Sequence, residues 1–177
     1  GAIYFQNDSD DTLRVVNSTF YQNNNQAGAG GAIYSEGHLE LYYNAFVGNS
    51  AYGDAGAVQL GSFPVTLQNN VFVNNSMARG LNNDLSPNGN QIIASGGNVI
   101  TDTTTWTGNY TLTSRSIIDY IDENHVETLL FESSAENTDC FTYYFKPRSA
   151  GLLAGNATDP IIPITEDQCG NKRETPS

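Results

Sequence analysis

Apolar and polar residues alternate in short runs that recur three times in the first part of the chain. In each run two aliphatic residues stand two positions apart, and a Phe and then an Asn follow at fixed distances. The three runs are Leu13-x-Val15-x4-Phe20-x2-Asn23, Leu39-x-Leu41-x4-Phe46-x2-Asn49 and Val65-x-Leu67-x4-Phe72-x2-Asn75. Apolar residues at positions i and i+2 are typical of a β-strand and not of a helix. Gly, Asn, Ser and Asp flank the runs and indicate turns.

Equivalent residues of successive runs lie 26 positions apart. A unit of this size with short strands cannot bury a core alone, so we expect the units to stack as turns of a solenoid, with like strands about 4.8 Å apart. The stacking predicts internal columns of like residues: Leu13, Leu39 and Val65; Val15, Leu41 and Leu67; Phe20, Phe46 and Phe72. It also predicts a corner ladder of side-chain amides: Asn23, Asn49 and Asn75.

The pattern therefore predicts an all-β fold, a right-handed parallel β-helix of about 3–4 rungs over residues 1–100. A weaker fourth turn is expected at 91–100, where Val99 falls 27 residues after Phe72. Residues 101–177 lose the repeat, and we expect an irregular, β-rich region that packs on or caps the solenoid. An antiparallel sandwich with regular turns is the alternative, and it would not require like residues in register across three segments.

Composition narrows the possible partners. The net charge is −12 although charged residues make up only 15%, and 21 Asn supply much of the polarity. Such a charge disfavours nucleic acid and anionic membrane surfaces. The sequence holds no run of eighteen apolar residues, so it predicts no membrane-spanning segment. Gly1 falls within a repeat, so we expect either a fragment of a longer protein or an assembly in which a neighbouring copy covers the first rung. In the second case the C-terminal part of one subunit, with its tail NKRETPS, would cap the first rung of the next.

Two cysteines, Cys140 and Cys169, lie outside the repeats. In a secreted chain they predict one disulfide, and two separate buried thiols are the alternative. Asn-x-Ser/Thr sequons support an extracellular or cell-surface location, and the candidates for glycosylation are Asn7, Asn74, Asn109 and Asn156. Asn17 also heads a sequon, but its strand-to-corner register argues against a glycan there.

Catalysis on polysaccharides requires paired carboxylates at like positions on neighbouring turns. Arg14, Glu40 and Thr66 occupy one such column, so Glu40 has no acidic partner. No basic pair converges for lyase chemistry. Asp8, Asp10 and Asp11 form the best acidic cluster, which we read as a solvated loop and not as a calcium site. The sequence thus predicts neither an enzyme nor a cofactor or metal.

Two His and several Tyr complete the candidates for chemistry. His38 and His125 have no visible nucleophile partner and are read as surface residues. Tyr42, Tyr43 and Tyr52 are candidates for stacking on sugars, with local packing as the alternative.

The stretch GAGGAIYSEGHLELYYNAFVGNSAYGDAGAVQL resembles the Gly-Gly-Ala-Ile repeats of right-handed β-helix surface proteins. These include the polymorphic outer membrane proteins and the choice-of-anchor Q proteins. GGNVI (96–100), KPRSAGLLAGN (146–156) and EDQCGNKRE (166–174) resemble features of the second family. The chain departs from that family at Ala150, Leu153 and Cys169, where Pro, Asp and Arg are usual. The Cys at this last position suggests a Cys140–Cys169 disulfide in place of a polar contact.

We therefore expect an extracellular structural protein, a β-helix building block of a filament, sheath or surface coat that associates end to end. The alternatives are a cell-surface adhesin or glycan-binding module, and a fragment of a carbohydrate-active β-helix enzyme.

Overall fold

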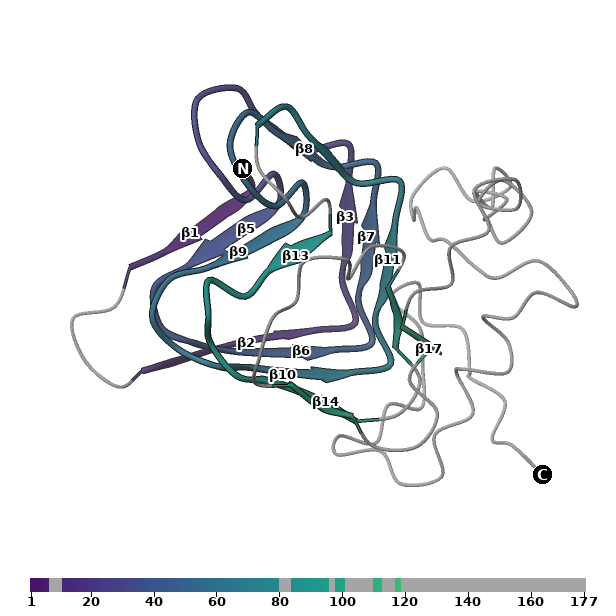
Figure 1. Cartoon of the computed structure of the whole chain (residues 1–177). Coiled ribbons are helices and arrows are strands. Elements are labelled where there is room, and N and C mark those ends of the chain that lie inside the picture. The colour runs from purple at the N-terminus through teal and green to yellow at the C-terminus, as the bar shows by residue number, and fades with distance from the viewer. Residues whose placement is uncertain (7–10, 80–83, 96–97, 101–109, 113–116, 119–177) are drawn as a thin grey trace, which may run out of the picture.

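The computed structural model describes residues 1–6, 11–79, 84–95, 98–100, 110–112 and 117–118. These residues wind into an all-β parallel solenoid of about three turns, seen end-on in Figure 1, and none of them lies in a helix. Each complete turn contributes one strand to each of four sheets. Strands of successive turns pair in parallel, as the repeat predicted.

The four sheets form the walls of the solenoid. The first sheet contains β1 (Ile3–Phe5), β5 (Ile33–Ser35), β9 (Val58–Leu60) and β13 (Leu85–Ser86). The second contains β2 (Thr12–Val16), β6 (His38–Tyr42), β10 (Val65–Gln68), β14 (Ile92–Ser95) and β16 (Tyr110–Leu112). The third contains β3 (Thr19–Tyr21), β7 (Ala45–Val47), β11 (Val71–Val73), β15 (Val99–Ile100) and β17 (Ile117–Ile118). The fourth contains β4 (Asn24–Asn25), β8 (Ser50–Ala51) and β12 (Ser76–Met77).

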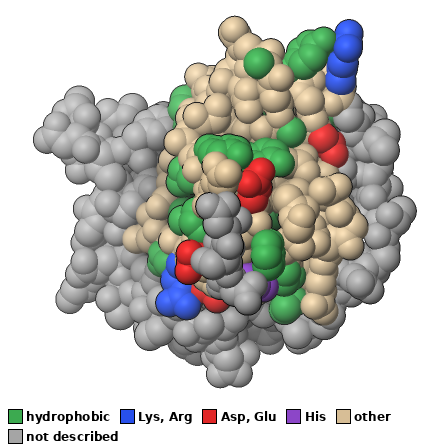
Figure 2. Space-filling model, turned by 90° about the vertical axis from the view of Figure 1, so that its left-hand side faces the viewer, with side chains coloured by type: hydrophobic (Ala, Val, Ile, Leu, Met, Phe, Trp, Pro, Cys, Tyr) green, Lys and Arg blue, Asp and Glu red, His purple; other side chains and the backbone are tan. Residues whose placement is uncertain are grey.

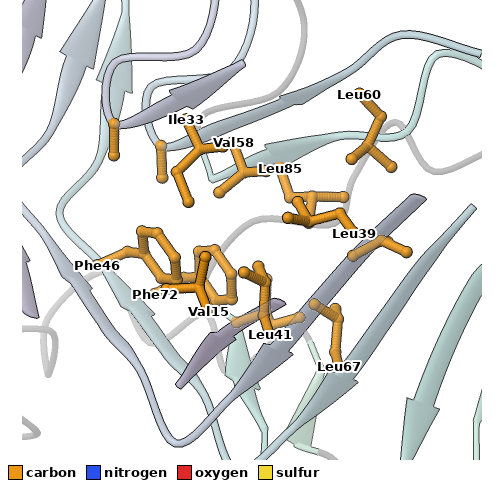
Figure 3. Close-up of a cluster of buried hydrophobic side chains, with 14 of the residues drawn as sticks. Val15, Ile33, Leu39, Leu41, Phe46, Val58, Leu60, Leu67, Phe72 and Leu85 are labelled. Carbon is orange, nitrogen blue, oxygen red and sulfur yellow. The ribbon is translucent and has the colours of Figure 1, made fainter. Parts of the chain in front are cut away.

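The predicted aliphatic columns are present. Leu39 pairs with Leu13 on one side and Val65 on the other, and Leu41 likewise lies between Val15 and Leu67. Val15, Leu39, Leu41 and Leu67 point into the interior (Figure 3), and Leu41 and Leu67 are fully buried there. Val65 belongs to the same core, and Leu13 packs against it. Apolar burial along these columns is the main stabilising contribution to stacking, at about 25 cal/mol per Å².

The predicted column of phenyl rings is also present. The Phe20 and Phe46 ring centroids lie 4.8 Å apart, and those of Phe46 and Phe72 lie 4.6 Å apart. The rings are nearly parallel, with interplanar angles of 3° and 7°. The strand spacing fixes this face-to-face geometry, since like residues lie one above another.

The fourth turn differs from the expectation by one residue. Phe72 pairs with Ile100, so Ile100 and not Val99 continues the phenyl column, while Val99 pairs with Val71. The offset from β11 to β15 is therefore two residues longer than the 26-residue repeat. Extra residues enter between strands, where a loop absorbs them without disturbing the alternation of side chains.

Parallel pairing continues past residue 100. Ile92 pairs with Tyr110, and Val99 pairs with Ile117, so this last turn advances by only 18 residues. The division of the chain at residue 100 stays a prediction. Cys140, Cys169 and the proposed disulfide lie outside the described residues.

Glycine is required where turns approach closely. A Cβ on Gly31 would collide with the main-chain oxygens of Gly56 and Ser50 on the neighbouring chain segments. Gly30 adopts a φ of +70°, which disfavours other residues. The recurring Gly-Gly and Gly-Ala pairs therefore allow the backbone of one turn to lie against the next.

Two corners of each turn use the left-handed conformation. Between the second and third sheets the corner residues are Asn17, Tyr43 and Asn69, with φ of 50°, 59° and 55°. Between the third and fourth sheets they are Gln22, Gly48 and Asn74, with φ of 52°, 63° and 53°. Asn and Gly tolerate this conformation better than other residues, which explains why they recur at the corners. In every case the next residue belongs to a polar column.

Candidate functional site

Buried amide side chains form ladders along two corners of the solenoid. The ladder predicted from the repeat contains Asn23, Asn49 and Asn75. Asn49 is completely buried and Asn75 nearly so. A buried amide is tolerated only when its donors and acceptor have partners, so the ladder depends on its hydrogen bonds.

The central amide of this ladder, Asn49, bonds to the turns on both sides. Asn49 Oδ1 accepts from the main-chain N–H of Asn23 at 3.0 Å and from Asn23 Nδ2 at 2.9 Å. Asn49 Nδ2 donates to Asn75 Oδ1 at 2.9 Å and to the Phe20 carbonyl at 3.0 Å. The ladder ends at the buried carboxylate of Asp84, which accepts from Asn75 Nδ2 at 2.8 Å.

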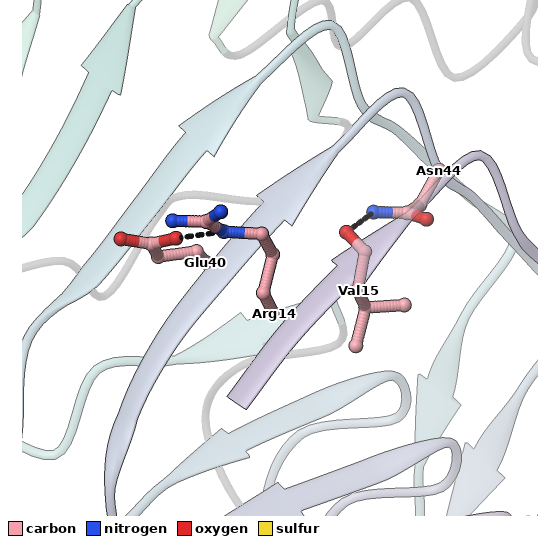
Figure 4. Close-up of polar contacts among 4 residues, drawn as sticks. All are labelled: Arg14, Val15, Glu40 and Asn44. Atoms are coloured by element: carbon pink, nitrogen blue, oxygen red, sulfur yellow. Dashed lines mark hydrogen bonds and ion pairs between the residues drawn. The ribbon is translucent and has the colours of Figure 1, made fainter. Parts of the chain in front are cut away.

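A second ladder lies at the corner between the second and third sheets. Asn44 Nδ2 donates to Asn70 Oδ1 at 3.0 Å, and Asn70 Nδ2 donates to Asn98 Oδ1 at 3.1 Å. Asn44 also donates to the Val15 carbonyl at 2.9 Å (Figure 4). In the first turn Ser18 takes the equivalent place and bonds Asn44 Oδ1 through its main-chain N–H.

Sequence reasoning missed this second ladder. Asn17 and Asn69, which stand one position earlier, are the left-handed corner residues and not members of this ladder. The signal that identifies the ladder is an Asn two residues before the inward apolar residue, as in Asn44 before Phe46 and Asn98 before Ile100. Because Asn occurs at both adjacent positions, spacing alone does not separate the two roles.

The first turn is less buried than the turns that follow it. Its inward side chains Ile3 and Leu13 are only half-buried and Phe20 is 9% exposed, whereas Ile33 and Phe46 one turn later are 0% exposed. Among the described residues, no strand pairs with the free side of β1, β2, β3 or β4. This turn thus combines apolar side chains with unpaired strand edges, which is the usual template for adding further strands.

The ladder of Asn23, Asn49 and Asn75 begins in the first turn with Asn23. Within the ladder every Oδ1 from Asn49 onward accepts two hydrogen bonds from the turn before it. No group among the described residues donates to Oδ1 of Asn23, which occupies the same position in the first turn. The first turn therefore offers an amide acceptor that is placed to receive donors from another turn.

The outer face of the second sheet carries the charged column considered for catalysis. Glu40 pairs with Arg14 and Thr66 in register. Arg14 Nε donates to Glu40 Oε2 at 2.5 Å (Figure 4), and this hydrogen bond and the carboxylate charge raise the pKa of Arg14. Glu40 is therefore engaged in an ion pair, and its neighbours in the column supply no second carboxylate.

The three Tyr residues proposed for sugar stacking lie in different surroundings. Tyr42 is only 3% exposed, and burial is the main cause that raises the pKa of its phenol. Tyr43 is half-buried in a left-handed corner. Tyr52 is 42% exposed, with the Arg79 guanidinium 5.0 Å from its ring centroid, a cation–π contact. The structure does not bring these three residues into one platform.

A different aromatic pair lies on the first sheet. Tyr4 is 63% exposed and stacks on Tyr34, with ring centroids 5.4 Å apart. The Tyr4 hydroxyl donates to Glu36 Oε1 at 3.3 Å. Figure 2 views the molecule from this side and shows apolar side chains gathered beside acidic ones. The sequence repeat did not predict this pair. Tyr4 and Tyr34 follow Gly-Ala-Ile in the first two turns, but Gln59 occupies the equivalent position in the third.

The remaining candidates are not assembled into a site. No group of three His, Cys, Asp or Glu that could hold a metal is found among the described residues. Asp11 is exposed, and Asp8 and Asp10 lie outside the described part. His38 packs against Phe63 at a centroid distance of 4.7 Å, and His125 lies outside the described residues. In the part that the structure describes, no helix has the length and hydropathy of a membrane span.

Of the five sequon residues, two lie in the described part of the chain. Asn74 is exposed at a corner between the third and fourth sheets, and Asn17 is half-buried at the other corner. Asn7, Asn109 and Asn156 lie outside the described residues. Glycosylation at each of the four candidate positions stays a prediction.

Comparisons with known proteins do not assign the chain to a family. No family model, no curated protein and no solved structure matches it significantly. The fold and the two ladders described above are therefore the basis for any functional conclusion.

Proposed function

We propose that this chain is a non-catalytic structural protein, a building block that stacks end to end in an extracellular filament, sheath or surface coat. The observation that carries the proposal is the constant register of the turns. Each described turn extends the same aliphatic, phenyl and amide columns, and the first-turn strands and Asn23 Oδ1 have the chemistry that receives a further turn. A strand edge of a second copy has the matching chemistry, since every turn of this solenoid bonds to its neighbour in this way.

The distribution of charge supports axial stacking. The first turn, residues 1–25, carries Asp8, Asp10, Asp11 and Arg14, so its net charge is −2 and most of the chain's −12 lies elsewhere. Copies that all carry a net charge of −12 repel one another, and added salt should strengthen the association by screening this repulsion.

The test measures assembly of the full chain by light scattering and electron microscopy. We compare Leu13→Lys with Thr12→Lys, because both residues lie on β2 of the first turn. Leu13 points toward the open core, whereas Thr12 is exposed on the outer face. We expect Leu13→Lys to abolish filaments or oligomers and Thr12→Lys to leave them intact. A monodisperse monomer of the unmodified chain at all concentrations and salt levels would contradict the proposal.

The location and family are part of the same proposal. An extracellular or cell-surface setting accounts for the sequons, of which Asn74 is exposed, and for a Cys140–Cys169 disulfide. Membership among right-handed β-helix surface proteins, such as the choice-of-anchor Q or polymorphic outer membrane proteins, is supported by the Gly-Ala-Ile repeats and the parallel solenoid.

A glycan-binding role is the second candidate, and the Tyr4–Tyr34 pair favours it. The exposed ring of Tyr4, stacked on half-buried Tyr34 beside the Glu36 carboxylate, offers a stacking face and a hydrogen-bond acceptor, which suit a neutral sugar. In a glycan array, Tyr4→Ala should abolish binding under this candidate. Tyr52→Ala should have no effect, because that ring already contacts Arg79. No binding by the unmodified chain would remove this candidate and leave the structural one untouched.

A further inference from the structure

The chain contains a single Asn-Gly pair, Asn88-Gly89, although it holds 21 Asn. In such a pair the main-chain nitrogen of Gly can attack the side-chain carbonyl carbon of Asn, because Gly has no Cβ to hinder the approach. Every other Asn in the chain precedes a residue that carries a side chain. The sequence therefore favours this reaction at Asn88 over all other positions.

The structure places this pair at the tip of a tight turn. Asn88 and Gly89 have φ of 49° and 78°, and the Asn90 N–H donates to the Pro87 carbonyl at 2.9 Å. Positive φ at both central residues is the signature of a type I′ turn, which Asn-Gly strongly favours. The turn joins β13 to β14 and so connects the first sheet to the second.

The reacting atoms at this turn are open to water. Asn88 and Gly89 are both exposed, and a Cβ built on Gly89 would meet no atom within 4 Å. Among the described residues, no main-chain carbonyl accepts the N–H of Gly89. The turn can therefore rearrange, and its nitrogen can react, without displacing packed atoms.

The ladder amides lack this freedom. Asn49 and Asn75 each precede a Ser, whose small side chain also hinders the attack little, but they are only 0% and 7% exposed. The Nδ2 of each donates to a main-chain carbonyl, of Phe20 and of Phe46 respectively, at 3.0 Å. Their reaction would leave these buried carbonyls without partners, which is costly. The fold thus protects the ladder and leaves Asn88 accessible.

The Asn88 amide also contributes to a contact between turns. Asn88 Nδ2 donates to the Gly61 carbonyl at 3.0 Å, and Asn90 Nδ2 donates to the same oxygen at 2.8 Å. Gly61 directly follows β9, the strand of the preceding turn that pairs with β13. Conversion of the Asn88 amide to an acid would remove one of the two donors and place a carboxylate near the Gly61 carbonyl.

We propose that Asn88 is a site of spontaneous deamidation, at which water converts its amide into aspartate and isoaspartate. The Gly89 nitrogen forms a bond to Cγ of Asn88, the bond from Cγ to Nδ2 breaks, and the proton of the Gly89 N–H passes through solvent to the departing ammonia. Water then opens the cyclic imide at either of its two carbonyl carbons. Nothing is oxidised or reduced. The reaction is independent of the proposed assembly, because it occurs within one chain.

The test incubates the folded full chain at several pH values and locates the converted residues by tandem mass spectrometry. Asn90 is the matched internal control, since its amide donates to the same Gly61 carbonyl but Gln91 follows it. We expect Asn88 to convert at least about tenfold faster than Asn90, because a side chain on the following residue hinders the attack. The rate should rise with pH, because the attacking nitrogen must lose its proton.

A variant tests the role of the glycine. Gly89→Ala should slow the conversion of Asn88 by about tenfold or more, and its Cβ enters open space, so the solenoid is retained. Equal rates at Asn88 and Asn90 would overturn the proposal. Conversion of Asn88 only in urea, and not in the folded chain, would overturn it as well.

A second measurement follows the effect on the neighbouring turn. The Val65 N–H donates to the Gln91 carbonyl, which comes directly after the reactive turn, and the equivalent bond one turn earlier joins the Leu39 N–H to the Pro64 carbonyl. In the converted chain we expect hydrogen exchange to be severalfold faster at the Val65 N–H and unchanged at the Leu39 N–H. Unchanged exchange at Val65 would contradict the inferred loss of contact between turns.

Discussion

At the scale of single residues, the molecule relies on fully bonded amides in an apolar interior. Asn49 shows the principle, since its side chain donates two hydrogen bonds and accepts two, all to neighbouring turns. A buried polar group contributes little net stability while it is paired, but an unpaired partner costs about 1–3 kcal/mol. The amides therefore favour one register, because any other register leaves several groups without partners.

Replacing Asn49 should be much more costly than replacing Asn23. Asn49→Ala leaves the Phe20 carbonyl and the Asn23 N–H without their partners, and we expect a loss of about 3–5 kcal/mol from these unsatisfied groups. Asn23→Ala removes a half-buried side chain at the end of the same ladder and should cost about 1–2 kcal/mol. Urea unfolding followed by circular dichroism measures both values. Equal losses would show that the ladder is not the source of the effect.

At the scale of elements, short strands are joined by corners that need a left-handed residue. The corner column between the second and third sheets has Asn17, Tyr43 and Asn69 with nearly equal φ. A side chain beyond Gly, Asn or Asp in this conformation costs about 1–2 kcal/mol. Tyr43 is thus a residue whose local preference conflicts with the repeat that surrounds it.

Tyr43→Asn should stabilise the protein because it restores the residue found at the same corner in the turns on both sides. We expect a gain of about 0.5–1 kcal/mol from relief of the backbone conformation. Tyr43→Ala is the control, since it removes the same ring but keeps a residue that disfavours the left-handed region. Thermal unfolding of the two variants separates the corner effect from loss of the ring. A Tyr43→Asn protein no more stable than Tyr43→Ala would contradict this explanation.

At the scale of the whole molecule, stability is a sum of similar turns, each of which contacts only its neighbours. Leu39 pairs in register with Leu13 and with Val65, so residues 26 apart occupy equivalent positions in successive turns. Deleting 39–64 joins His38 to Val65 and should place Val65 on Leu13, Phe72 on Phe20 and Asn75 on Asn23. One complete turn is then removed while every column remains continuous.

We expect the protein lacking 39–64 to fold cooperatively with reduced stability, measured by urea unfolding and main-chain hydrogen exchange. The control lacks 39–51, which removes half as many residues but takes β6, β7 and β8 out of three sheets. This control should lose cooperative unfolding, because β2 and β3 no longer have partners in register. Cooperative folding of the control alone would contradict the stacked-turn account.

The sequence by itself determined the period, the direction of the strands and the members of the inward columns. These are local and repeated features: alternation places side chains on one face, and recurrence every 26 residues places like residues in register. Phe20, Phe46 and Phe72 could be assigned to one column for this reason alone. The offset of the fourth turn was missed because loop residues change the count without changing the alternation.

Only the tertiary structure decided which Asn lies in the ladder and which outward side chains are buried. Asn69 and Asn70 are adjacent and chemically identical, and the difference between corner and ladder arises from the φ that the turn adopts. Val47 and Val73 are outward in the repeat, so the alternation predicts exposure, yet they are buried. The alternation along a strand fixes which face a side chain points to, and it does not fix whether that face is covered.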